Sequence, residues 1–247
     1  AGEVQLEGRN LARSDGTVER DASQISMIFQ NPVGALNPTM RVGSQIARAI
    51  QFNQQIGRST ALQTAIEMIG HVGIPGPERV ARSYPHQLSG GMCQRIMIAL
   101  AISCRPRLLI ADEPTTALDV TVQAQIFELI KALVEEIGCG VVFITHDLGA
   151  VAEMADRVTV MYGGQVMEEL PVVELLNDPK HPYTRYLLES VIREVDHRIE
   201  DIGVDFALTG CRFGHRCLLA HDSCNEYPTL EETSPGHRLS CLAEITE

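Results

Sequence analysis

The sequence predicts an α/β fold, and three successive patterns carry that prediction. A short apolar run at residues 108–111 is followed by an amphipathic helical pattern at 122–137, and then by a second apolar run at 141–145. Strand, helix and strand in this order are typical of a βαβ unit with parallel strands. A chain of 247 residues with 45% hydrophobic content can bury a substantial core around such a sheet.

The rest of the chain divides into segments around this unit. Residues 1–39 contain alternating polar and apolar stretches and predict a β-rich part of the core. Residues 40–103 have helical periodicity broken by Gly and Pro, which predicts a helical lobe inserted between strands. Residues 104–170 are expected to complete the core, ending in a hairpin. Residues 171–247 predict a small Cys-rich C-terminal extension.

Charge and hydropathy exclude several classes of protein. The net charge is −12, the pI is about 5.1, and no run of Lys or Arg occurs, so we expect no nucleic-acid partner. No apolar stretch approaches the roughly 20 residues of a spanning helix, and no signal segment opens the chain. We therefore expect membrane association only through partner subunits.

Acidic and imidazole side chains follow the two apolar runs. Asp112 and Glu113 come directly after the first run, and His146 follows the second. Because parallel strands present ligand sites at their carboxyl ends, these groups suit Mg²⁺, an attacking water and a phosphate. Each feature alone is also compatible with an ordinary surface residue.

A serine and two glycines precede an apolar helical segment. The sequence Leu-Ser-Gly-Gly-Met-Cys-Gln-Arg occupies residues 88–95 and leads into that segment. Exposed backbone N–H groups and the helix dipole make such a start an anion site. The alternative is that Ser89 is an ordinary N-cap.

Together with Gln30, these segments resemble the ATP-binding-cassette (ABC) ATPases in order and spacing. Gln30 matches the glutamine loop, residues 88–94 the signature motif, 108–113 the Walker B strand, 117–119 the D-loop, and His146 the switch histidine. The resemblance implies a P-loop NTPase core of RecA-like type, with a helical signature lobe.

The resemblance also implies ATP and Mg²⁺ as cofactors and a role for each matching residue. It implies catalysis by Glu113 and His146, and Mg²⁺ held by Gln30 and Asp112. Two subunits of this family sandwich ATP head to tail. The residues expected to contact nucleotide or its metal are Gln30, Ser89, Gly90, Gly91, Gln94, Asp112 and Asp119.

The family's phosphate loop, G-x-x-x-x-G-K-[ST], does not occur in the sequence. Only two lysines are present, Lys131 and Lys180, and neither follows a glycine. We expect the chain to be truncated at its N-terminus before Ala1, and to bind and hydrolyse ATP poorly alone. The alternative is a non-hydrolysing assembly or regulatory subunit that donates its signature motif to a partner.

Two further segments resemble one branch of importers. Residues 31–38 are similar to the Q-D-P-x-x-x-L-N-P run of dipeptide and oligopeptide importer ATPases, and residues 177–184 to their H-P-Y-T segment. The whole chain resembles the D-type subunit of dipeptide importers. This implies a second ATPase subunit, two transmembrane permeases, an indirect extracytoplasmic peptide-binding protein, and a peripheral location at the cytoplasmic face of the bacterial inner membrane. Nickel or another small solute is the alternative cargo. The two ATPase subunits can be identical or different.

Four of the seven cysteines crowd the tail, at Cys211, Cys217, Cys224 and Cys241. Their spacing, with five, six and sixteen residues between successive members, lacks the close pair of structural zinc sites. Some relatives hold a [4Fe–4S] cluster in this region. The resemblance therefore favours a [4Fe–4S] cluster on these thiols, with Zn²⁺ as the alternative.

Overall fold

The computed structural model describes residues 3–11, 24–116, 118–192 and 209–243, and the chain divides into two compact units. The first unit runs from Ala1 to His146 and the second from Asp147 to Glu247. Within the described ranges, no helix combines the length and apolar character needed to cross a membrane.

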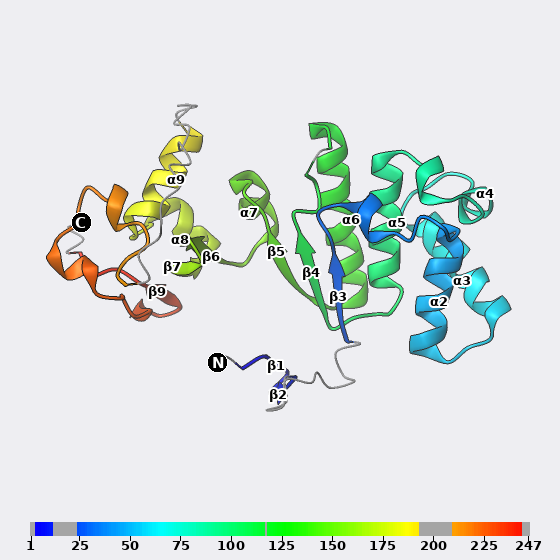
Figure 1. Cartoon of the computed structure of the whole chain (residues 1–247), viewed down its shortest axis with the longest axis horizontal. Helices are drawn as coiled ribbons and strands as arrows, with labels where there is room; N and C mark the ends of the chain where they lie inside the picture. The colour runs from blue at the N-terminus through cyan, green and yellow to red at the C-terminus, as the bar shows by residue number, and fades with distance from the viewer. Residues whose placement is uncertain (1–2, 12–23, 117, 193–208, 244–247) are drawn as a thin grey trace. The chain divides into compact units, whose positions relative to one another are not determined.

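The first unit is built on a parallel sheet with the strand order β3-β4-β5 (Figure 1). β3 spans Ile25–Ile28, β4 spans Leu108–Asp112 and β5 spans Gly140–Ile144. The helix α6, Val120–Ile137, connects β4 to β5, which confirms the predicted βαβ unit. Asp112 pairs with Ile144 in the register, so the carboxyl ends of β4 and β5 lie at one edge of the sheet.

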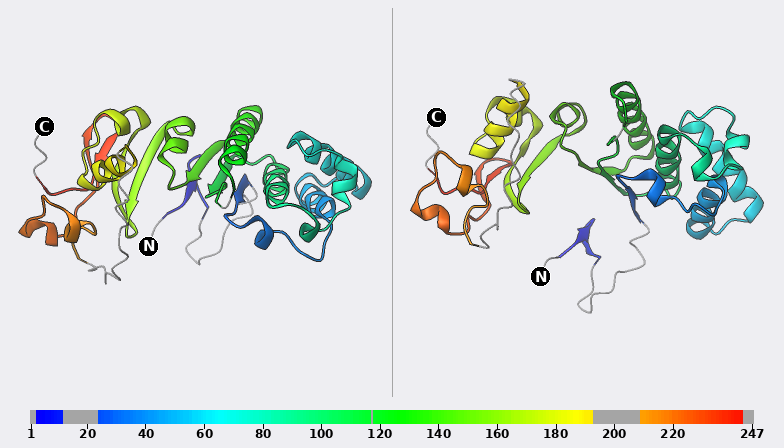
Figure 2. Two further views of the ribbon diagram at one scale, coloured as in Figure 1. Left: turned by 90° about the horizontal axis from the view of Figure 1, so that it is seen from above. Right: turned by 45° about the horizontal axis from the view of Figure 1, so that its top comes forward.

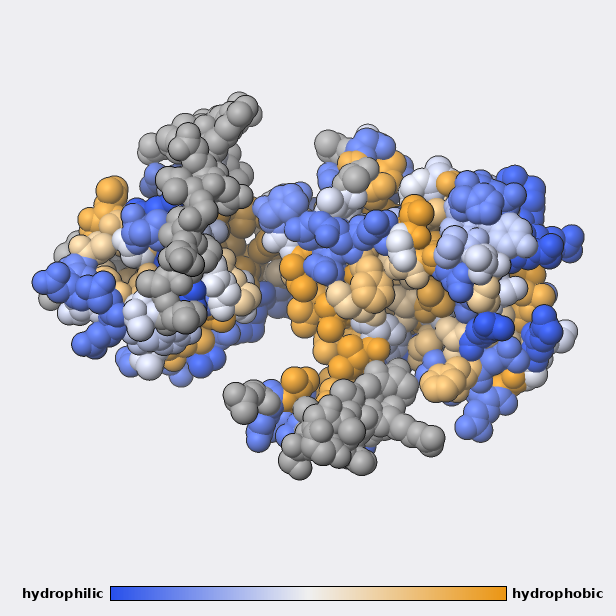
Figure 3. Space-filling model, viewed as in Figure 1, coloured by the Kyte–Doolittle hydropathy of each residue, from blue (hydrophilic) through white to orange (hydrophobic). Residues whose placement is uncertain are grey.

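Helix α6 covers one face of this sheet. Its Phe127 meets Phe143 of β5 edge-on, with ring centroids 5.6 Å apart, and its Ile130 is buried. On the opposite face of β5, Val142 and Ile144 are about half exposed. Figure 3 shows apolar surface over these strands. Burial on one face alone explains why β5 alternates between half-buried and exposed positions.

A helical lobe follows β3, as the sequence predicts. Of its helices, α2, α3 and α4 lie on the far side of α5 from β5 in the views of Figures 1 and 2. Gly43 makes the close approach of α2 and α4 possible, because a Cβ there would lie 2.7 Å from Cβ of Ala81. The lobe comprises α1 (Pro32–Ala35), α2 (Val42–Gln54), α3 (Arg58–His71), α4 (Pro77–Ala81), a 3₁₀ turn η2 (Pro85–Gln87) and α5 (Gly90–Ile102).

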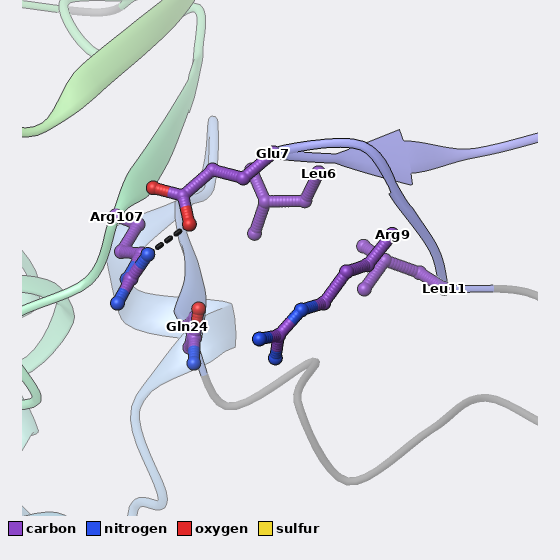
Figure 4. Close-up of a pocket in the computed structure, with 6 residues that line it drawn as sticks. All are labelled: Leu6, Glu7, Arg9, Leu11, Gln24 and Arg107. Atoms are coloured by element: carbon purple, nitrogen blue, oxygen red, sulfur yellow. Dashed lines mark hydrogen bonds and ion pairs between the residues drawn. The ribbon is translucent and has the colours of Figure 1, made fainter.

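A two-stranded hairpin precedes the sheet. β1 is Gln5–Leu6 and β2 is Arg9–Asn10, joined by Glu7 and Gly8, both with positive φ. Figure 4 shows the Glu7 carboxylate paired with the Arg107 guanidinium, just before β4, which ties the hairpin to the sheet.

The second unit contains an antiparallel sheet with the order β6-β7-β9-β8. Here the structure differs from the predicted boundary at residue 170: the hairpin of β6 and β7 pairs with strands from the C-terminal segment instead of ending the parallel sheet. In the register, Glu168 and Glu169 of β7 face Leu239 and Arg238 of β9. The elements are α7 (Leu148–Met154), β6 (Arg157–Tyr162), β7 (Gln165–Pro171), α8 (Val172–Asn177), α9 (Pro182–Ile192), η3 (Gly214–Arg216), η4 (Asp222–Asn225), β8 (Glu231–Ser234) and β9 (His237–Leu239).

Phe213 anchors the Cys-rich segment to the core of this unit. Its ring contacts those of Tyr162 and Tyr183, with centroids 5.5 and 5.2 Å away. Cys211 and Cys217 flank it in sequence and pack against the same core. One buried aromatic side chain thus holds the middle of a segment that has little regular structure.

Candidate functional site

The site begins with the backbone of Glu113, at the end of β4. Its N–H donates to the carbonyl of Ile144 at 2.9 Å, so the residue is fixed to the end of β5. Its φ is +43°, in the left-handed region that a residue with a Cβ rarely adopts. Strain of this kind costs on the order of 1–3 kcal/mol and gathers at functional positions.

Three side chains from three segments converge on the Glu113 carboxylate. Nε2 of Gln30, after β3, donates to Oε2 at 2.6 Å, and the hydroxyl of Thr116 donates to the same oxygen at 2.8 Å. Nδ1 of His146, after β5, lies 3.3 Å from Oε1. The structure therefore brings together Gln30, Glu113 and His146, which are 116 residues apart at the extremes, as the motif order predicts.

These donors determine the charge of the carboxylate. The Thr116 hydroxyl, followed by the His146 ring, holds the pKa of Glu113 below its ordinary value, while burial opposes them. Glu113 is therefore ionised at neutral pH and can accept a proton. The His146 side chain is 79% exposed, so it can also reach a group that approaches from solvent.

The donors available beside Glu113 suit a magnesium ion. Asp112 ends β4 at the same sheet edge and is half buried. Gln30 uses its amide nitrogen toward Glu113, and the bond does not engage its amide oxygen. A carboxylate and an amide oxygen are hard ligands of the kind that Mg²⁺ prefers. The donor set thus fits the metal that the sequence resemblance implies.

The serine and glycines of the signature segment form the start of α5. The Ser89 hydroxyl accepts a hydrogen bond from the backbone N–H of Met92 at 3.3 Å, so it is the N-cap. Ser89 and Gly90 are exposed, and Gly91 is half buried. At the start of this 13-residue helix, the backbone N–H groups of Gly90 and Gly91 are therefore open to an anion from outside the chain.

Gln94 does not lie with these residues, and the expectation that it contacts nucleotide needs correction. Its side chain is only 2% exposed, on the buried side of α5, and its Nε2 has no hydrogen-bond partner among the described residues. On α5 it shares a face with Met97, Ile98 and Ala101, which are also buried.

Asp119 has a structural role at the start of α6. Its carboxylate accepts from the backbone N–H of Val122 at 3.0 Å and caps the helix. Val122 in turn lies 3.6 Å from the position that a Cβ on Gly91 would occupy. The first turn of α6 and the start of α5 are therefore neighbours, although Asp119 makes its described contact within its own helix.

The four tail cysteines are free thiols in the second unit. The Cys211 N–H donates to the Cys224 carbonyl at 2.9 Å. Burial raises the pKa values of Cys211 and Cys241, and the charges of nearby cysteines in the group raise them further. Within the described ranges, however, no three His, Cys, Asp or Glu side chains meet in the arrangement that a metal ion requires.

Sequence reasoning missed Thr116, which donates to Glu113. The sequence does contain a signal for this contact: a residue with a hydroxyl group lies three positions after Glu113. At that spacing a turn can bring the hydroxyl back to the carboxylate.

Comparison with known proteins agrees with this geometry. The ABC transporter family profile matches residues 1–116, and the profile of the oligopeptide/dipeptide transporter C-terminal region matches residues 167–224. The probable peptide ABC transporter ATP-binding protein y4tR of Sinorhizobium fredii is 47% identical over 251 residues, covering 97% of this chain and 75% of that protein. The oligopeptide transport ATP-binding protein AppD of Bacillus subtilis is 43% identical, with 98% and 76% covered.

A solved structure supports the fold. The ATP-binding cassette MJ0796, solved as a dimer in a post-hydrolysis state with ADP and Pi, superposes with a TM-score of 0.59 at 27% identity. The match covers 70% of this chain and 74% of that one. The fold and the two family profiles agree with one another. This chain belongs to the ABC transporter ATPases, among the ATP-binding subunits that carry the oligopeptide/dipeptide transporter C-terminal region.

Proposed function

We propose that the protein hydrolyses ATP to drive peptide import, with Glu113 as the base that activates water. One observation carries the proposal: side chains that follow three parallel strands meet at the Glu113 carboxylate. A carboxylate that is held by donors and ionised at neutral pH can take the proton of an attacking water.

The other residues of the site would serve the nucleotide. Asp112 and the amide oxygen of Gln30 would hold Mg²⁺, which when bound neutralises charge on the phosphates. The exposed His146 ring would turn to the terminal phosphate. Ser89, Gly90 and Gly91 would present the N-terminal N–H groups of α5 to nucleotide held by a second ATPase subunit, and Asp119 would lie at the same interface.

The relatives suggest the assembly in which this happens. y4tR and AppD are named as peptide and oligopeptide transport proteins, which supports a peptide cargo. We propose a head-to-tail pair of ATPase subunits bound to two permeases at the cytoplasmic face of the inner membrane, with a peptide-binding protein outside. The net charge of −12 agrees with a role that does not involve nucleic acid.

The base assignment is tested by Glu113→Gln in the assembled transporter. We expect ATPase turnover to fall by about 10²–10⁴, because a positioned base is lost, while ATP binding persists. Glu136→Gln, the same change on the exposed face of α6, is the matched control and should keep normal turnover.

Near-normal hydrolysis in Glu113→Gln would contradict the proposal. It would favour the alternative of a non-hydrolysing subunit. That alternative predicts that replacing Ser89 stops hydrolysis in a partner subunit while Glu113→Gln does not.

We also propose that Cys211, Cys217, Cys224 and Cys241 bind one [4Fe–4S] cluster, with Zn²⁺ as the alternative. Their shared electrostatic neighbourhood supports this, and ligation would require local movement from the arrangement described above. Protein purified without oxygen should contain iron and sulfide, and Cys217→Ser should lose both and expose the segment to protease. Cys104→Ser, outside the group, is the control. Stoichiometric zinc would select the alternative, and protein without either metal would contradict both.

A further inference from the structure

The turn after Glu113 fastens that residue to the rest of the core. The Thr116 N–H donates to the Glu113 carbonyl at 3.2 Å, so residues 113–116 form a closed turn. Thr115 is buried inside it, and its carbonyl accepts Nε2 of Gln123 from α6 at 3.3 Å. The turn that carries Thr116 is therefore tied to α6 through the carbonyl of Thr115.

The two oxygens of the Glu113 carboxylate are held unequally. Oε2 accepts two short hydrogen bonds, from Gln30 at 2.6 Å and from Thr116 at 2.8 Å. Among the described residues, Oε1 has a single side-chain partner, Nδ1 of His146 at 3.3 Å. The weaker contact leaves Oε1 as the oxygen that can most easily accept a new proton donor, such as a water molecule.

The three donors also differ in what else they must do. In the function proposed above, Gln30 serves a metal ion and His146 a phosphate, so both have a second partner. Thr116 belongs to the same turn as Glu113, and its β-branched side chain has a single stiff rotatable bond before the hydroxyl. Its bond to Oε2 is therefore the one that can persist while the other two donors turn to the nucleotide.

We propose that Thr116 is a positioning residue for hydrolysis: its hydroxyl anchors Oε2 of Glu113 so that Oε1 faces the attacking water. The inference rests on the proposed function of Glu113 as the base. In this role Thr116 does not contact the nucleotide. Its loss should therefore lower turnover and leave the affinity for ATP unchanged.

The test compares two substitutions in the assembled transporter. Thr116→Val keeps the side-chain shape and removes the hydroxyl, so we expect kcat to fall by about ten- to a hundredfold, as for a lost hydrogen bond to a charged group, with KM for ATP unchanged. Thr116→Ser keeps the hydroxyl and should recover most of the turnover. Thr60→Val, on the exposed face of α3, controls for the loss of a threonine hydroxyl and should leave kcat unchanged.

A double mutant separates positioning from folding. If Thr116 acts through Glu113, adding Thr116→Val to Glu113→Gln should lower kcat no further, whereas a general structural defect would add to the loss. The idea is overturned if Thr116→Val turns over like the wild type, if Thr116→Ser is as impaired as Thr116→Val, or if the two losses add. Active Glu113→Gln protein would instead show that the base assignment itself has failed.

Discussion

Two glutamates in the two units each receive three donors, and they differ in the kind of donor. Glu113 is held by side chains, and its own side chain is 27% exposed. Glu168 of β7 is fully buried, and it accepts the backbone N–H groups of Lys180 and His181 at 2.7 and 3.1 Å. The third group at Glu168 is Nε2 of His237, 2.7 Å away.

The kind of donor decides whether each carboxylate can exchange its hydrogen-bond partners: Glu113 can, and Glu168 cannot. Gln30 and His146 are exposed, and these two side-chain donors can rotate away at small cost because water replaces them. Backbone donors are fixed by the fold, and a buried carboxylate that loses its partners has no water to turn to. By this reasoning the Glu113 network suits a catalytic cycle, and the Glu168 network suits a permanent joint between β7, β9 and the start of α9.

The largest effect that this comparison predicts is on stability. Glu168→Gln should lower the free energy of unfolding of the second unit by about 2–6 kcal/mol, because an amide has one acceptor oxygen where the carboxylate has two, and each buried N–H group left without an acceptor costs about 1–3 kcal/mol. Glu113→Gln should change the stability of the first unit by no more than about 0.5 kcal/mol. Urea unfolding of the purified chain measures both. Equal effects at the two positions would remove the distinction.

The second prediction concerns acid. Burial lowers the pKa of His181 to about 4, and the ring accepts the Tyr183 N–H at Nδ1, so the folded unit requires the neutral form. The unfolded chain binds this proton near pH 6.5, so the stability is fully present above that pH and is lost as the pH falls toward 4. The loss approaches about 3 kcal/mol.

His181→Asn isolates that contribution. Asparagine keeps an acceptor for the Tyr183 N–H but does not titrate, so the variant's stability should vary less between pH 7 and pH 5 than that of the wild type. His86→Asn, at an exposed position in the first unit, is the control. The same acid sensitivity in His181→Asn as in the wild type would assign it to another group.

The smallest effects distinguish buried amides with and without an acceptor role. Oε1 of Gln165 accepts the backbone N–H of Arg212 at 2.9 Å, so Gln165→Met should cost about 1–3 kcal/mol. Nε2 of Gln94 has no partner among the described residues, so Gln94→Met should be within about 1 kcal/mol of neutral and should keep ATPase activity. A large loss of turnover in Gln94→Met would restore a functional role to that residue.

The elements that the sequence predicts well are those with strong local patterns. β4, α6 and β5 combine an apolar run, an amphipathic period and a second apolar run, and their ends position Glu113 and His146. β8 and β9 were not predicted, because four exposed residues and a three-residue strand have no such pattern. β9 forms by pairing with β7, and β8 by pairing with β9. The burial of Gln94 could have been predicted from helical periodicity, since apolar residues follow it at three, four and seven positions.

The pairing of β7 with β9 has a consequence for how this family member can change in length. The chain leaves the sheet at Pro171, the last residue of β7, and returns at Glu231, the first residue of β8, so the sheet holds both ends of the stretch between them. The entropic cost of closing such a loop grows only slowly, by about 0.6 kcal/mol for each doubling of its length. Insertions at exposed positions of this stretch that contact neither β7 nor Phe213 should therefore be tolerated, whereas a deletion that removes β9 would leave β8 without the strand with which it pairs.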